Sequence, residues 1–360
     1  MTVPDSLMPA IPAVARESPG ASPTLADVAR LAGFSPATVS RVLTGSARVR
    51  PQTRRQIEQA VAHLGYVRNH AQRAVNPRRA GSGRPARAGS IAFVVCEDIV
   101  KLFAEPFFAR MLWSVSQTLA SRDLQLVLLT LHAPGDYHTV VRYLRNGHVD
   151  GALMASMHWR TAEDLAGFGV PLVLIGRPQR DAERFSYVDA DNVGGAAMAV
   201  DYLLKQGRTT IATIAGPPDM APGVDRLLGY RQAMTRAVAT DTGLIAYGDF
   251  SRQSGEHAMS RLVDLRPGLD AVFVASDLMA AGALRALRRL GRRVPEDVAV
   301  IGFEDSPLAQ YTDPALSTVR QPADVMASVA TRELLSQLAA PERDPVHVIL
   351  DTKLVLRAST

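Results

Sequence analysis

The 360-residue chain has a single cysteine, Cys96, and no long apolar run. One thiol excludes an intrachain disulfide and a multi-cysteine zinc site. No stretch approaches the roughly 18 uninterrupted apolar residues of a membrane span. The N-terminal sequence has proline and aspartate where a secretory signal needs an unbroken apolar core. We therefore expect a cytoplasmic protein with no membrane segment.

Sequence motifs of common enzyme classes are also missing. The chain has no G-x-S-x-G elbow, no G-x-x-x-x-G-K-S/T phosphate loop, no H-E-x-x-H, and no G-x-G-x-x-G after its first apolar run. The eight histidines are scattered without metal-ligand spacing. We expect no catalytic activity, no cofactor and no metal.

Positive charge is concentrated at one end of the chain. Residues 1–90 hold 13 Arg and Lys against 4 Asp and Glu, whereas the remainder holds 27 against 31. A basic module on a mildly acidic body is typical of a protein that binds a polyanion at one end. A solvated basic face explains the same charge, so charge alone does not decide between them.

The basic end has the pattern of a small helical domain. Residues 1–23 contain five prolines and are predicted to be a disordered leader. Thr24 is a suitable N-cap for a first helix, which Gly33 can end in the left-handed conformation. A second helix is expected from Ser35 to Leu43 and a third over residues 51–64. The first two form a predicted helix-turn-helix.

Residues 76–89, NPRRAGSGRPARAG, have the composition of a linker. After them, short apolar runs such as SIAFVV (90–95), LQLVLLT (124–130), TTIATIAG and VAVIGF alternate with amphipathic stretches. This alternation predicts parallel sheets covered by helices on both faces, the doubly wound α/β class. The length suits two α/β subdomains with a cleft between them.

Between Thr24 and Thr360 the sequence resembles the LacI/GalR family of bacterial transcription regulators. The strings that carry the resemblance are TLADVARLAGFSPATVSRVL, VDADNVGGA, RLLGYRQAM, YGDF, ASDLMAAGALRALRRLGRRVPEDVAVIGFEDSPLA and LSTVRQP. The resemblance implies a DNA-binding headpiece over residues 24–75. It also implies a periplasmic-binding-protein-like body over residues 90–360 that binds an effector and dimerises.

The resemblance places the second helix in the major groove of DNA. Arg41 is the best candidate for reading a base, since a guanidinium can donate two hydrogen bonds to guanine; a phosphate contact is the alternative. Ala37 offers only an apolar contact. The implied DNA-binding residues of the helical domain are Thr24, Ser35, Pro36, Ala37, Thr38, Ser40, Arg41 and Arg48.

Residues 69–75 resemble the hinge helix of the family, which inserts an apolar wedge into the minor groove. Asn69, Gln72 and Val75 are the implied contacts, with Val75 where relatives usually have leucine. The arginines of the following linker either contact DNA or belong to a solvated tether.

The same resemblance supplies an effector cleft. Phe250 and Phe108 are candidate aromatic walls for a sugar or a purine, with ordinary core packing as the alternative for both. Arg226 is the leading polar candidate, and Arg177 is a weaker one. Three further polar candidates lie at the end of a predicted strand or just after one: Ser276, Asp277 and Glu304. Ligands of open α/β sheets bind at these strand ends. We expect Asp191 and Asn192 to order the start of the next helix.

These features together predict a homodimeric repressor, not a tetramer, that binds pseudo-palindromic operator DNA under the control of a small carbohydrate. Two other functions remain open. An exported sugar-binding protein would share the body but not the basic headpiece. An architectural DNA binder without an effector would not need Arg226, Phe250 and Asp277.

Overall fold

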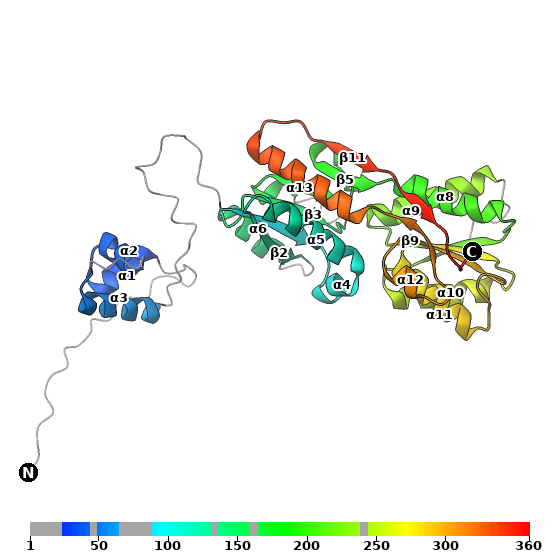
Figure 1. The fold of residues 1–360 in the computed structure, drawn as a ribbon, viewed down its shortest axis with the longest axis horizontal. Helices are drawn as coiled ribbons and strands as arrows, with labels where there is room; N and C mark the ends of the chain where they lie inside the picture. The colour runs from blue at the N-terminus through cyan, green and yellow to red at the C-terminus, as the bar shows by residue number, and fades with distance from the viewer. Residues whose placement is uncertain (1–23, 44–48, 65–87, 132–135, 159–164, 238–243) are drawn as a thin grey trace, which may run out of the picture. The chain divides into compact units, whose positions relative to one another are not determined.

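The computed structural model describes residues 24–43, 49–64, 88–131, 136–158, 165–237 and 244–360. The chain divides into two compact units, residues 1–83 and 84–360 (Figure 1). The predicted leader, Arg48, the predicted hinge helix with Asn69, Gln72 and Val75, and most of the predicted linker lie outside the described residues.

The N-terminal unit contains the three predicted helices, α1 (Leu25–Ala32), α2 (Pro36–Leu43) and α3 (Pro51–Leu64). Thr24 caps α1 through a reciprocal capping box with Asp27, and Gly33 ends it with φ of 72°. Ser35 precedes α2, where its hydroxyl accepts from the amide of Thr38 at 3.2 Å. The predicted helix-turn-helix is confirmed.

A small apolar core holds these helices together. The buried residues are Val28 and Ala29 of α1, Val39 and Val42 of α2, and Ile57 and Ala60 of α3. Burial of Val39 and Val42 leaves the opposite side of α2 in solvent, with Pro36, Ala37 and Arg41 exposed. The exposed side of α2 is therefore available to a partner.

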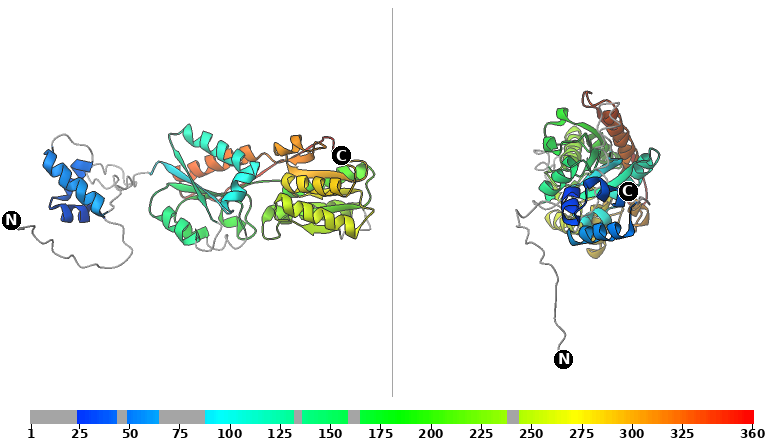
Figure 2. Two further views of the ribbon diagram at one scale, coloured as in Figure 1. Left: turned by 90° about the horizontal axis from the view of Figure 1, so that it is seen from below. Right: turned by 90° about the vertical axis from the view of Figure 1, so that its left-hand side faces the viewer.

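The C-terminal unit contains two six-stranded sheets, each covered by helices on both faces (Figures 1 and 2). The first has the strand order β11-β5-β4-β3-β1-β2. Its strands are β1 (Ser90–Val95), β2 (Gln125–Thr130), β3 (Gly151–Ala155), β4 (Leu172–Ile175), β5 (Ser186–Ala190) and β11 (His347–Leu350). One face packs on α5 (Pro106–Ala120) and α13 (Ala323–Ala339), and the other on α6 (Asp136–Arg145) and η3 (Leu165–Phe168). Two short helices, α4 (Ile99–Ala104) and η4 (Ala182–Arg184), complete this subdomain.

The second sheet has the order β12-β10-β9-β8-β6-β7. Its strands are β6 (Ile211–Ala215), β7 (Ile245–Tyr247), β8 (Ala271–Val274), β9 (Ala299–Glu304), β10 (Ser317–Arg320) and β12 (Lys353–Val355). The helices α8 (Asn192–Lys205) and α9 (Ala221–Arg236) cover one face, and α10 (Arg252–Leu265) and α11 (Asp277–Arg289) cover the other. A short helix, α12 (Leu308–Tyr311), follows β9. All strand pairs are parallel except β10 with β12, so the predicted doubly wound class is confirmed.

The chain crosses between the two subdomains three times, after β5, after β10 and after β11. Asn192 lies at the first crossover, Gln321 at the second and Thr352 at the third. Among the described residues, no helix is both long and apolar enough to cross a membrane.

Candidate functional site

A cavity of about 60 Å³ lies between the two subdomains. Its walls come from segments that follow the carboxyl ends of strands of both sheets, together with the starts of α5, α9 and α13. The apolar lining residues are Phe107, Phe108, Ile175, Met220, Pro222, Phe250 and Met326. The polar and glycine residues are Glu97, Glu105, Ser156, Gly176, Asp189, Arg226, Glu304 and Gln321. Strand ends of this kind are the usual ligand position in open α/β sheets.

A larger groove of about 610 Å³ lies on the outer surface of α10 and α11. It has no aromatic lining, and its Glu256 is already paired with Arg285 and Arg289. The smaller cavity between the subdomains therefore fits a ligand-binding site better, since such sites combine apolar walls with a few convergent polar groups.

Unusual backbone conformations gather at this cavity. Six non-glycine residues in the described part of the chain have positive φ, and three of them line the cavity: Ser156 (59°), Phe250 (68°) and Glu304 (113°). This conformation is rare for a bulky side chain, and such strain concentrates at binding sites. A Cβ atom at Gly216 would overlap the Phe250 ring, so glycine makes room for it.

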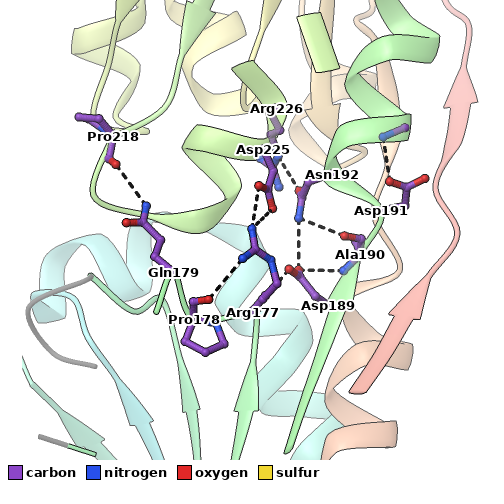
Figure 3. Close-up of polar contacts among 11 residues, drawn as sticks. Arg177, Pro178, Gln179, Asp189, Ala190, Asp191, Asn192, Pro218, Asp225 and Arg226 are labelled. Carbon is purple, nitrogen blue, oxygen red and sulfur yellow. Dashed lines mark hydrogen bonds and ion pairs between the residues drawn. The ribbon is translucent and has the colours of Figure 1, made fainter. Parts of the chain in front are cut away.

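Arg226 is one of the polar groups that line the cavity, and Figure 3 shows its side chain beside that of Asn192. Its side chain is buried, and it donates to Asn192 Oδ1 at 2.9 Å, to the Ala275 carbonyl at 2.6 Å and to Gln321 Oε1 at 3.0 Å. The guanidinium also lies 3.8 Å from the centre of the Phe303 ring. Arg226 thus joins two of the three crossover segments and borders the cavity at the same time.

Two carboxyl groups of the cavity are held in a poorly solvated environment. Burial raises the pKa of Glu304 to about 8, because the attraction of Arg226, 3.9 Å away, does not offset the loss of water and the charge of Glu105 adds to the rise. Burial likewise raises the pKa of Glu105 to about 7. Each side chain is therefore costly to ionise without a donor.

One set of contacts between the two subdomains involves His158, which follows β3. Its Nδ1 lies 2.7 Å from Asp219 of the second subdomain, and its Nε2 lies 3.8 Å from Glu97. Hydrogen bonding to Glu97 has the largest effect on the pKa of His158 and raises it. Hydrogen bonding to Asp219 raises this pKa further, whereas burial lowers it. Protonated His158 therefore links the two subdomains.

A second set comes from the segment after β4 (Figure 3). The Nη2 atom of Arg177 donates to both carboxylate oxygens of Asp225 in α9, each at 2.8 Å, and Gln179 donates to the Pro218 carbonyl at 3.2 Å. Arg177 is not among the cavity-lining residues. Its observed contact is between the subdomains.

Two residues expected to bind the effector have other contacts. Ser276 caps α11 by accepting from the amide of Met279, and the Asp277 carboxylate accepts from the Ser306 amide at 2.7 Å and from the Thr318 hydroxyl at 2.5 Å. Neither lines the cavity. The start of α11 directs Asp277 into the subdomain interior, where burial raises its pKa to about 8. Asp191, by contrast, caps α8 as expected.

The structure brings Phe108, Arg226, Phe250 and Glu304 together at the cavity, although Phe108 also belongs to the core under β1. Sequence reasoning missed Glu97, Glu105, Asp189 and Gln321. Glu97 and Glu105 flank a short helix just after the first strand, and this position was the only available signal for them.

Comparison with known proteins agrees with this architecture. Residues 24–69 match the profile of bacterial regulatory proteins of the lacI family, and residues 200–360 match a periplasmic binding protein-like domain. The chain is 44% identical over 341 residues to the HTH-type transcriptional regulator CelR of Thermobifida fusca, covering 94% of this chain and 98% of that protein. It is 32% identical over 342 residues to the HTH-type transcriptional repressor CytR of Escherichia coli K12, covering 94% and 96%.

Among solved structures, the transcriptional regulator CelR–cellobiose complex is similar, with a TM-score of 0.73 and 43% identity over 94% of this chain and 100% of that one. The matched regions include both the helical headpiece profile and the body that holds the cavity. This chain therefore belongs to the LacI family of bacterial transcriptional regulators.

Proposed function

We propose that this protein is a cytoplasmic repressor whose operator affinity is controlled by a β-linked glucose disaccharide, with cellobiose as the first candidate. The observation that carries the proposal is the cavity, which combines Phe107, Phe108 and Phe250 with four acidic side chains and Arg226. Aromatic faces stack on sugar rings, while carboxylates and guanidinium groups bond hydroxyls. The likeness to the CelR–cellobiose complex supports this class of ligand.

The size of the cavity supports a conformational mechanism. Pockets for small molecules commonly measure about 300 to 1,000 Å³, whereas this one measures about 60 Å³. A disaccharide is accommodated only if the subdomains separate and the cross-cavity contacts change. Arg226 bonds both the first and the second crossover, so its displacement by a sugar alters the hinge directly. Ligand binding and subdomain orientation are then coupled.

The proposed DNA-binding element is helix α2. Its exposed Pro36, Ala37 and Arg41 are the groups that enter the major groove. Arg41 bonds a guanine, while Thr38 and Ser40 contact phosphate. A homodimer presents two such helices to a pseudo-palindromic site. The match at residues 24–69 favours this regulator over an exported binding protein. The regulatory family also favours a role without catalysis.

Isothermal titration of the full chain with cellobiose tests the proposal, with glucose and adenosine as comparison ligands. We expect saturable cellobiose binding and weaker or no binding of the other two. Phe250→Ala removes the stacking surface and is expected to weaken cellobiose binding by about tenfold, which corresponds to the worth of one aromatic contact. Absence of cellobiose binding by the native chain would contradict the assignment.

A further inference from the structure

Four carboxyl groups line the cavity, and they differ in their hydrogen bonding. Glu97 accepts from the Ser156 hydroxyl at 2.8 Å and from Lys101 at 3.0 Å. Asp189 accepts from two backbone amides and from the Asn192 side chain. Glu304 is near Arg226. Glu97 and Asp189 are therefore hydrogen-bonded by groups of the protein, and Glu304 has the positive charge of Arg226 3.9 Å away.

Glu105 is the exception. Its Oε1 is buried and has no hydrogen-bond partner in the described part of the structure. Such an acceptor is costly, since a buried polar group without a partner loses its bonds to water and gains nothing in return. The cavity that Glu105 lines provides the place where a donor could be added.

The local structure explains why Glu105 has no partner. It occupies the N-cap position of α5, yet its side chain makes no capping bond, and Pro106 at the first position of the helix has no amide hydrogen. Lys101 of α4 already bonds Glu97. The charge of Lys101 lowers the pKa of Glu105, whereas the negative charges of Glu97, Asp249 and Asp98 add to the rise that burial causes.

We propose that Glu105 is an effector-binding residue that accepts hydrogen bonds from sugar hydroxyls and so favours ligands rich in such donors. This inference rests on the proposed function and assigns a specific residue to it. The Oε1 atom of Glu105 is buried without a donor, and a bound sugar would supply one. The relief of this cost is a source of binding free energy that an apolar ligand of the same size cannot obtain.

Three variants test the inference by titration with cellobiose at pH 8. Glu105→Ala removes the acceptor and is expected to weaken binding about 10- to 100-fold, the range for a hydrogen bond to a charged group. Glu105→Gln keeps one neutral acceptor and should fall between Glu105→Ala and the native chain. Glu342→Gln makes the same chemical change at an exposed position and should leave affinity unchanged. Equal affinities of Glu105→Ala and the native chain would overturn the inference.

A ligand-free measurement separates this inference from the identity of the sugar. The cost of ionising Glu105 is absent below pH 4.5, grows as the pH rises to about 7 and is constant above that. The melting temperature of Glu105→Gln should therefore exceed that of the native chain at pH 8 and approach it at pH 5. If the native chain does not bind cellobiose, only the identity of the proposed ligand is wrong. If the melting temperatures of Glu105→Gln and the native chain differ by the same amount at every pH, the role of Glu105 is overturned.

Discussion

Replacement of Arg226 by methionine removes the side chain that joins the cavity to two crossover segments. The substitution leaves three buried acceptors without their donor: Asn192 Oδ1, the Ala275 carbonyl and Gln321 Oε1. Methionine retains an apolar contact with Phe303 and fills most of the volume. The variant therefore isolates the loss of hydrogen bonds from the loss of packing.

The structure gives the size of the effect. Each orphaned buried acceptor costs about 1 to 3 kcal/mol, and removal of the desolvated charge of Arg226 returns part of that sum. We expect a net loss of about 3 to 5 kcal/mol in the free energy of unfolding of the body. For a body of this size, that loss lowers the melting temperature by about 5 to 9 °C.

Calorimetry of the full chain measures the change, with Arg236→Met as the matched control. Arg236 is on the same helix, but its side chain is 53% exposed and pairs with Asp201; loss of such a surface pair changes stability by less than about 1 kcal/mol. If Arg226→Met destabilises the protein no more than Arg236→Met, the hydrogen bonds of Arg226 do not hold the crossovers and the reasoning is refuted.

Three further changes test other parts of the account. Arg41→Ala should weaken operator binding by about 1 to 3 kcal/mol in fluorescence anisotropy and relax one base preference, and an equal loss on random DNA would reassign Arg41 to phosphate. Asp225→Asn removes the charged partner of Arg177 and eases separation of the subdomains; calorimetric titration should show cellobiose affinity raised by up to about tenfold, whereas an unchanged or lower affinity would show that this ion pair does not oppose ligand binding. His158→Asn removes a histidine whose pKa is raised above 6.5 in the fold. The native chain should be more stable than this variant at and below pH 6.5 and lose the advantage as the pH rises past the raised pKa of His158; a difference that is constant in urea titrations from pH 6 to 9 would rule out the protonated link.

Local chemistry made the headpiece predictable. The Thr24 cap, the left-handed Gly33 and the spacing of Val39 and Val42 act within a few residues, so the sequence alone located the helices. Short apolar runs such as residues 91–95 were equally informative, because a strand buried on both faces has few polar positions. Some elements are too short to give a clear repeat of apolar residues in the sequence. These are the three-residue strands β7 and β12 and the short helix α4.

The cavity was only partly predictable, because its side chains meet through the tertiary fold. Phe250 and Arg226 were found from the family motifs that contain them, and Glu304 was found from its position at the end of a strand. Asp277 has the same kind of position, but the start of α11 directs its carboxylate toward Ser306 and Thr318. The lack of a partner at Glu105 depends on Pro106, Lys101 and the opposing subdomain, and no sequence pattern reports it.

The most direct test of the central claim measures operator binding and sugar binding in one experiment. A labelled duplex selected by the full chain from a random pool is bound at a concentration near its dissociation constant, and cellobiose is added while anisotropy is followed. We predict release of the duplex at cellobiose concentrations that match calorimetric binding, and no release from the Phe250→Ala variant at those concentrations. Saturable cellobiose binding with unchanged anisotropy would show that the cavity and the headpiece are not coupled, and would contradict control of DNA binding by this sugar.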